Sequence, residues 1–157
     1  MRQPHNVVVF VFSTEASRIE YALFQRADDG NWQAVSGGVE EGEDTATAAR
    51  RETAEETGLR GAAPLYRLDM VSGVEKECFA AAELWPEDLY IVRKHYFAMD
   101  VSGRAGEIVL SGEHRAVRWL TYEAAYATLR YDDDRTALWE LDRRLHRGHL
   151  PAALLDA

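Results

Sequence analysis

The stretch "GGVEEGEDTATAARRETAEETGL", Gly37 to Leu59, decides how the rest of the chain is interpreted. It is rich in acidic side chains and carries two adjacent arginines in its middle. Asp44 or Thr45 is suited to begin a helix as its N-cap, and Gly58 stands where a left-handed residue commonly ends one. The stretch therefore predicts an acidic helix between these residues, preceded by a segment with two adjacent glycines.

The acidic side chains of this helix are not evenly spread. Glu52, Glu55 and Glu56 fall on one face, because residues three and four positions apart share a face of a helix. Crowded carboxylates raise their own pKa values unless cations lie among them. Mg²⁺ suits such a set, because it binds carboxylate oxygens and completes its shell with water and substrate phosphates. A solvated helix with Glu and Arg pairs is the alternative that composition alone leaves open.

Length and charge limit the classes of function. The chain has 157 residues and 46% hydrophobic content, which predicts a single domain over residues 1–157 with a substantial core. A net charge of −9 argues against non-specific binding to nucleic acid or to an anionic membrane, because both depend on lysine and arginine. No stable nucleic-acid partner is expected, and an anionic substrate needs local compensation of charge.

The cellular compartment is predicted from two further features. Cys78 is the only cysteine, so the chain has no internal disulfide and no thiolate metal site, as is usual in a reducing cytoplasm. The apolar run from Val7 to Phe12 is too short for a membrane span or a signal sequence. We therefore expect a cytoplasmic protein that does not enter a membrane.

Hydrophobic periodicity predicts a mixture of strands and helices. A β-branched and aromatic run forms a buried central strand, and the next alternating run is its hairpin partner. Two helices close the chain, the first capped by Thr121. Together these elements predict an α/β sandwich. The expected strands are residues 6–13, 18–26, 32–35, 63–73, 89–101 and 114–120, and the two closing helices are residues 122–130 and 135–148.

The spacing within the opening stretch is specific. Gly37 is followed after five residues by Glu43 and after seven more by the run from Arg51 to Leu59. This pattern, with nine specified positions over 23 residues, resembles the Nudix box, the signature of the Nudix hydrolases. Thr53 departs from it, because the family usually has a bulky aliphatic residue there. That departure concerns local packing more than chemistry.

The resemblance implies a fold and a metal site. The fold is a Nudix-type α/β/α sandwich with a mixed β-sheet and a loop-helix-loop catalytic motif. Glu52, Glu55 and Glu56 are the implied metal ligands, together with the backbone carbonyl of Gly37. Arg51 is implied to orient a glutamate through charge-assisted hydrogen bonds. The implied ion is Mg²⁺, with Mn²⁺ as an alternative, and the identity of the general base stays open.

The flanks of the box narrow the resemblance. "LFQRADDGNWQAVSGGVEEGE" and "GEHRAVRWLTYEAAYATL" resemble the bacterial dihydroneopterin triphosphate pyrophosphatases, Nudix enzymes that also hydrolyse nucleoside triphosphates. The implied reaction cleaves a nucleoside or pterin triphosphate to a monophosphate and pyrophosphate. Glu113 matches a loop position that often supplies an extra metal-binding or general-base carboxylate, and Glu43 is implied to support the metal shell or the helix start. Relatives of this kind often form homodimers.

Other substrates and other roles stay open. Dinucleoside polyphosphates, ADP-sugars and capped RNA ends are alternative substrates within the same family, and RNA fits least because the chain is acidic and lacks a basic stripe. A Nudix module that senses a nucleotide without cleaving it is the alternative outside catalysis. Every charged position of the box is present, which favours an enzyme.

Substrate contacts are predicted from basic and aromatic residues outside the box. Arg26, Arg93 and Lys94 are candidates for phosphate binding, with pairing to acidic neighbours as the alternative. Trp32 is a candidate for stacking on a base or pterin ring, with a place in the core as the alternative. Trp85 and Tyr90 are further aromatic candidates. His114 is a candidate for contact with the substrate, with a structural role as the alternative.

Overall fold

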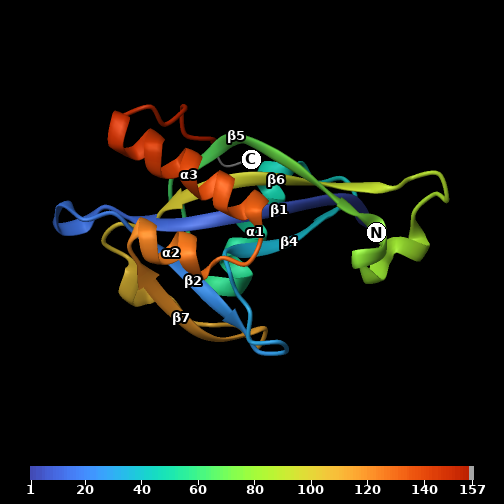
Figure 1. Ribbon diagram of the computed structural model, residues 1–157, viewed down its shortest axis with the longest axis horizontal. Coiled ribbons are helices and arrows are strands. Elements are labelled where there is room, and N and C mark those ends of the chain that lie inside the picture. The colour runs from blue at the N-terminus through green and yellow to red at the C-terminus, as the bar shows by residue number, and fades with distance from the viewer. Residues whose placement is uncertain (156–157) are drawn as a thin grey trace.

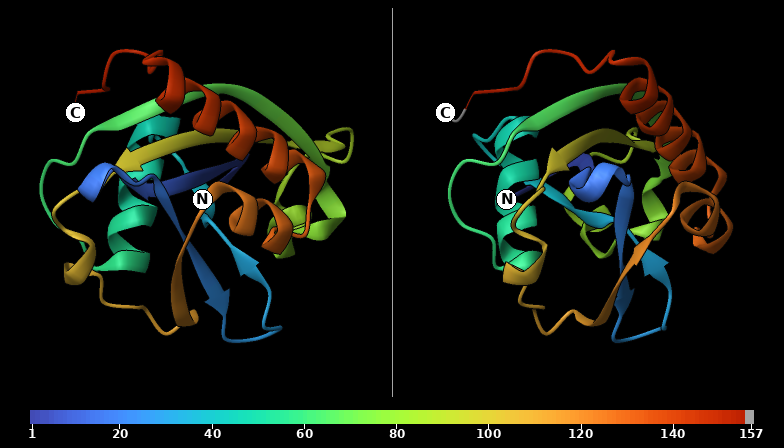
Figure 2. Two further views of the ribbon diagram at one scale, coloured as in Figure 1. Left: turned by 60° about the vertical axis from the view of Figure 1, so that its left-hand side comes forward. Right: turned by 90° about the vertical axis from the view of Figure 1, so that its left-hand side faces the viewer.

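The computed structural model describes residues 1–155, in which a mixed seven-stranded sheet lies between helices (Figure 1). Figure 2 shows α1 on one side of the sheet and α2 and α3 on the other, so the predicted α/β/α sandwich is confirmed. The strands are β1 (Arg2–Ser13), β2 (Glu20–Arg26), β3 (Trp32–Gln33), β4 (Val35–Glu40), β5 (Leu65–Glu75), β6 (Ile91–Asp100) and β7 (His114–Leu120). The helices are α1 (Thr45–Thr57), α2 (Tyr122–Thr128) and α3 (Asp132–Arg147).

Strand β1 forms the centre of the molecule, as its sequence predicts. Its residues 7–12 are almost completely buried and alternate between two hydrophobic layers. Val7, Val9 and Val11 face the layer that includes the alanines of α1. Phe10 and Phe12 face the layer that includes the leucines of α3. A continuous apolar run is thus explained by a strand that is covered on both sides.

Strands β1 and β2 pair only near the turn that joins them, and then they diverge. The pairing of β1 with β2 runs from Val11 to Ser13, as in the predicted hairpin. Beyond it, β4 takes the place beside β1, while β3 pairs with β2 at Phe24 and Gln25. The other edge of β1 pairs with β6 in parallel. The short segment from β3 to β4 therefore fills the space between the diverging strands.

Three boundaries differ from the sequence predictions by three residues or more. Strand β1 begins at Arg2 instead of residue 6, because its first residues pair with β4. Strand β4 continues through Gly37 and Gly38, which the sequence placed after a strand. Helix α3 begins at Asp132 instead of residue 135, so the three consecutive aspartates from Asp132 to Asp134 lie in its first turn. In each case backbone pairing or helix geometry extends an element into residues of low intrinsic propensity.

Helix α1 shows the predicted caps and explains the unusual threonine. Asp44 is the N-cap and accepts a hydrogen bond from the Thr47 backbone at 2.7 Å. Gly58 ends the helix with a φ of 71°. Thr53 is buried on the packing side, and its hydroxyl donates to the Ala49 carbonyl at 2.7 Å. The hydrogen bond of the Thr53 hydroxyl is thus made within the helix itself, so the helix accommodates a threonine at a position where the motif usually has an aliphatic residue.

Helix α3 closes the second layer. Leu138 and Leu141 are fully buried in this layer, and Leu145 is partly buried there. No helix in residues 1–155 combines the length and the apolar character needed to cross a membrane.

Candidate active site

Glu56 on α1 is the most deeply buried acidic side chain of the Nudix-like motif, with 2% of its surface exposed. Its Oε2 accepts a hydrogen bond from the Ser36 backbone at 3.1 Å. Its Oε1 has no hydrogen-bond partner. Burial raises the pKa of Glu56 to about 8, and the charge of Glu52 adds to the effect. Burying a carboxylate oxygen without a partner costs free energy of folding, unless a ligand such as a cation binds to that oxygen.

His114, at the start of β7, lies against Glu56. Its Nε2 is 3.4 Å from Glu56 Oε1, and its Nδ1 has no hydrogen-bond partner. Its ring packs near Phe24, and burial lowers its pKa. Both pKa shifts favour the uncharged forms, so without a cation this contact is not an ion pair. The structure places His114 in the wall of the site, where it contacts Glu56 directly.

Glu52 lies one turn earlier on α1, directly against Gly37 of β4. A Cβ atom on Gly37 would come 2.0 Å from the Glu52 carboxyl carbon. Only glycine therefore allows the helix carboxylate to approach this strand. Burial raises the pKa of Glu52, and the neighbouring Arg51 opposes that rise.

Arg51 connects the helix to the residues that precede it. Its guanidinium donates two hydrogen bonds to Glu43, at 3.0 and 2.8 Å, and one to the Gly38 carbonyl at 2.8 Å. It also donates to Glu52 Oε1 at 2.8 Å. The hydrogen bond from Arg51 holds the pKa of Glu43 below its usual range. Such a planar, bidentate arrangement fixes the position of Glu52 relative to Gly38.

The remaining predicted carboxylates lie further out. The Glu55 side chain is 57% exposed, and Arg51 Nη1 is 3.5 Å from it. Glu113 is exposed on the loop before β7. Within residues 1–155, no three His, Cys, Asp or Glu side chains are already arranged to hold a metal ion. Glu52 and Glu56 therefore lie close enough for the charge of Glu52 to act on Glu56, whereas the Glu55 side chain is exposed.

A cavity of about 490 Å³, here called the α1-side cavity, opens beside these groups. Gly37, Glu52, Glu113 and His114 contribute to its lining. Arg2 also lines it, although the sequence pattern placed Arg2 outside the first strand and gave no signal for it. The Arg2 guanidinium donates to Asn6 at 2.9 Å, but its Nε has no hydrogen-bond partner. Arg2 is thus a half-buried cation that the sequence interpretation missed.

The predicted arginines differ in position. Arg26 lines the α1-side cavity, and it donates two hydrogen bonds to Asp28, at 2.8 and 2.6 Å. Arg93 is exposed on β6 and lines neither this cavity nor the second one described below. Of the two, only Arg26 is placed where a substrate phosphate in the cavity can meet it.

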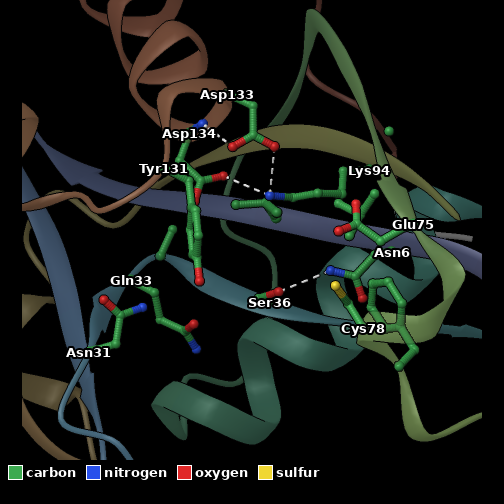
Figure 3. A pocket seen from close by; sticks show the side chains of 15 residues that line it. Asn6, Asn31, Gln33, Ser36, Glu75, Cys78, Lys94, Tyr131, Asp133 and Asp134 are labelled. Carbon is green, nitrogen blue, oxygen red and sulfur yellow. Dashed lines mark hydrogen bonds and ion pairs between the residues drawn. The ribbon is translucent and has the colours of Figure 1, made fainter. Parts of the chain in front are cut away.

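A second cavity of about 440 Å³, here called the α3-side pocket, lies toward α3 (Figure 3). Lys94, Tyr131, Asp133 and Asp134 form one part of its lining. The Lys94 ammonium is bound to Asp133 at 2.9 Å and to Asp134 at 3.0 Å, and only 12% of its side chain is exposed. The predicted phosphate candidate Lys94 is therefore already paired with two carboxylates, which was the alternative left open by the sequence.

The aromatic candidates also lie apart from one another. Trp32 is half-buried, and the Arg118 guanidinium lies 4.8 Å above its ring. Trp85 is 7% exposed, and its indole donates to the Arg2 carbonyl at 2.9 Å. Tyr90 is 71% exposed on the surface. None of the three lines the α1-side cavity or the α3-side pocket, whereas Phe79 and Tyr131 line the latter.

Comparisons with known proteins agree with this arrangement. The family model of the NUDIX domain matches residues 2–141. The bis(5'-nucleosyl)-tetraphosphatase of Mus musculus is 33% identical over 126 residues, which are 79% of each chain. The dihydroneopterin triphosphate diphosphatase of Escherichia coli is 30% identical over 140 residues, which are 87% of this chain and 91% of the relative.

A solved structure supports the same assignment. The crystal structure of a Listeria monocytogenes protein assigned to the NUDIX hydrolases is similar with a TM-score of 0.86 and 32% identity, covering 96% of this chain and 99% of that one. The motif, the buried carboxylates and these likenesses agree. The chain belongs to the Nudix family, and it is a hydrolase of phosphoanhydride substrates.

Proposed function

We propose that this chain is a Mg²⁺-dependent pyrophosphohydrolase that cleaves a nucleoside or dihydroneopterin triphosphate to a monophosphate and pyrophosphate. The observation that carries the proposal is the unpartnered, buried oxygen of Glu56 beside Glu52 and a cavity that two arginines line. The likeness to the Escherichia coli diphosphatase, which covers most of both chains, supports the choice of a triphosphate.

The residues present fit a hard divalent cation. The available donors are oxygens: the carboxylates of Glu52 and Glu56, the Gly37 carbonyl, and the nearby carboxylates of Glu55 and Glu113. Burial raises the pKa values of Glu52 and Glu56, and a bound cation would favour their charged forms. Oxygen-only donor sets favour Mg²⁺ or Mn²⁺ over softer metals. A bound divalent ion would neutralise the polyphosphate, polarise the phosphorus and lower the pKa of bound water.

The protein's own residues supply position and charge. Arg2 and Arg26 line the cavity and would meet phosphate oxygens, which offsets the acidic charge of the chain. Arg51 holds Glu52 in place through its bonds to Glu43 and Gly38. Glu113 lines the cavity from an exposed loop, and we assign it one of two roles, a contact with the ion or the removal of a proton from the attacking water.

The test is a panel of nucleoside and pterin triphosphates with MgCl₂, with the products identified by phosphorus NMR. We expect pyrophosphate and a monophosphate from at least one member, and a large loss of activity in Glu56→Gln. Glu123→Gln is the matched control, because Glu123 is exposed on α2, a helix that contributes nothing to the α1-side cavity. Absence of cleavage across the panel would contradict the proposal.

A dinucleoside polyphosphate is the second candidate substrate. The likeness to the Mus musculus tetraphosphatase favours it, as does the presence of a second cavity for another group. The products separate the two candidates, because a dinucleoside polyphosphate gives two nucleotides and no pyrophosphate. Hydrolysis in oxygen-labelled water then locates the phosphorus that is attacked.

A further inference from the structure

The geometry points to the α3-side pocket as the site that selects the ring of the substrate, with Asp133 and Asp134 accepting hydrogen bonds from adjacent N–H groups on a flat heterocycle. This inference rests on the proposed function, because it concerns the group attached to the phosphates. The ring class it names carries an N–H beside an exocyclic amino group, as guanine and pterin do. Adenine lacks that pattern.

The first step is the connection between the two cavities. Gln33 and Ser36 line both the α1-side cavity and the α3-side pocket. They belong to the segment that fills the space where β1 and β2 diverge. The Ser36 backbone also donates to Glu56. A substrate whose phosphates lie beside Glu52 and Glu56 therefore has the α3-side pocket next to it, across Ser36.

The charged residues that line the α3-side pocket determine which groups it can bind. Among the described residues that line the α3-side pocket, three are acidic, Glu75, Asp133 and Asp134, and one is a cation, Lys94. Lys94 is already paired with two of these carboxylates. The pocket is therefore unfavourable for a phosphate and favourable for a group that donates hydrogen bonds. The α1-side cavity is lined by two arginines, Arg2 and Arg26, and by four carboxylates, Asp28, Glu40, Glu52 and Glu113, so phosphate binding there depends on the proposed divalent ion as well as on the arginines.

The third step is the way the two carboxylates are held. Asp134 Oδ1 accepts from Lys94 at 3.0 Å and from the Tyr96 hydroxyl at 2.7 Å. Asp133 Oδ2 accepts from Lys94 and from the Ser72 hydroxyl, both at 2.9 Å. Asp134 Oδ2 accepts no hydrogen bond from any residue in the part of the chain that the structure describes. The carboxylates are thus fixed by their neighbours, and Asp134 keeps a free acceptor atom.

The charge state of these groups agrees with an acceptor role. Burial alone would raise the pKa of Asp133, but hydrogen bonding and charge from Lys94 outweigh burial and hold it below its usual range. Burial would likewise lower the pKa of Lys94, but the charges and hydrogen bonds of Asp134 and Asp133 together outweigh burial, and the pKa is raised. Asp133 is therefore a carboxylate and Lys94 an ammonium at neutral pH.

The shape of the pocket suits a flat ring. Tyr131 lies beside the Lys94 and Asp133 network, as Figure 3 shows, and Phe79 supplies another aromatic side chain of the lining. The amides of Asn31 and Gln33 also line it, and each can donate to a ring carbonyl. A volume of about 440 Å³ accommodates one such ring system.

Selectivity follows from the pattern of donors. Guanine and pterin present an N–H and an amino group side by side, which suits carboxylate acceptors. Adenine would bring a lone pair toward the same carboxylates, which disfavours it. We expect kcat/KM to be at least roughly 10-fold higher for GTP than for ATP, with ITP in between because it lacks the amino group.

A labelling experiment tests binding without hydrolysis. Cys78 lines the pocket and is the only cysteine of the chain, so a maleimide reports on access to the pocket. We expect guanosine and pterin to slow the labelling of Cys78, measured by mass spectrometry, and adenosine to have little effect. Equal protection by adenosine, or no protection by guanosine, would overturn the inference. Because no phosphate is cleaved, this result is independent of the proposed function.

Variants in the first turn of α3 test the residues themselves. We expect Asp134→Asn to lower the GTP to ATP ratio of kcat/KM at least roughly 10-fold, with Asp133→Asn smaller. Asp132→Asn is the matched control, because the Asp132 side chain is 97% exposed in the same turn. Unchanged ratios in both pocket variants would overturn the inference. If either variant unfolds, the guanosine protection of Cys78 in the wild-type chain decides.

Lys94 is a positioning residue in this account. Lys94→Met removes the cation that holds both carboxylates, so KM for GTP is expected to rise more than kcat falls. Lys94→Arg keeps the charge and is expected to restore part of the guanine preference. If Lys94→Met keeps the wild-type KM for GTP, the positioning role is wrong.

Discussion

The two cavities share Gln33 and Ser36, yet they are built in contrasting ways. Beside the α1-side cavity, Glu56 and Arg2 each have a polar atom without a partner. In the α3-side pocket, Lys94 is bonded to both Asp133 and Asp134. The first arrangement is incomplete without a ligand, whereas the second is largely satisfied within the protein.

This contrast separates chemistry from recognition. Buried polar atoms without partners are costly, so their concentration near one cavity marks the place where ions and phosphates complete the structure. A fixed network of satisfied carboxylates instead offers a rigid surface of acceptors, which discriminates between rings at little cost on binding. Variants of residues beside the α1-side cavity should therefore leave the α3-side pocket intact.

The largest effect is expected for the carboxylates of α1. Glu56→Gln and Glu52→Gln each remove a negative charge from the proposed ion site, and we expect kcat to fall by about 10²- to 10³-fold. The change is measured by release of pyrophosphate at saturating Mg²⁺. Guanosine protection of Cys78 should persist in both variants. If it is lost as well, the two cavities are not independent.

The next effect concerns the contact between α1 and β4. Gly37→Ala places a methyl group against the Glu52 carboxyl, so we expect about 10²-fold lower kcat in a protein that still folds. Gly106→Ala is the control, because a Cβ there meets nothing within 4 Å. Normal activity of Gly37→Ala would show that the approach of Glu52 to this strand is unimportant.

A smaller effect on stability is expected at Arg51. Arg51→Lys loses the bidentate bond to Glu43, and we expect the free energy of unfolding to fall by about 1–3 kcal/mol. Urea denaturation of Arg51→Lys, Glu43→Gln and the double variant measures it. The two single losses should not add, because they break the same contact. If the losses of the two single variants add fully in the double variant, the contact between Arg51 and Glu43 does not stabilise the protein.

A further effect is a dependence of stability on pH in the metal-free protein. Burial raises the pKa of Glu56 from 4.5 to about 8, so between these values the folded protein keeps a proton that the unfolded chain releases. The free energy of unfolding should therefore fall as pH rises through this window, by at most about 1.4 kcal/mol per pH unit. Urea denaturation with EDTA measures the slope, and Glu56→Gln should flatten it. Parallel curves for both proteins would contradict the shift.

The sequence predicted the fold well where periodicity and caps agree. The buried run of β1, the hairpin to β2, and the helix between Asp44 and Gly58 all depend on local patterns, and all are seen. Strand β4 was missed because its glycines have low strand propensity, and pairing with β1 overrides that propensity.

The candidate site was predictable only in part. The box identified Glu52, Glu56 and their neighbours through fixed spacing on one helix. Arg2 and Asp134 have no such spacing, because each reaches its cavity through contacts between distant parts of the chain. Most charged side chains of a protein are exposed to solvent, so the sequence alone does not show which of them line a cavity.

If Glu52 and Glu56 hold a divalent ion, the metal-free protein should bind Mn²⁺ through these two carboxylates. Electron paramagnetic resonance titration measures Kd for the wild-type chain, Glu52→Gln, Glu56→Gln and the control Glu123→Gln. We predict that Glu52→Gln and Glu56→Gln each weaken binding by at least roughly 10-fold, whereas the control matches the wild type. Equal Mn²⁺ affinity in all four proteins would contradict the account.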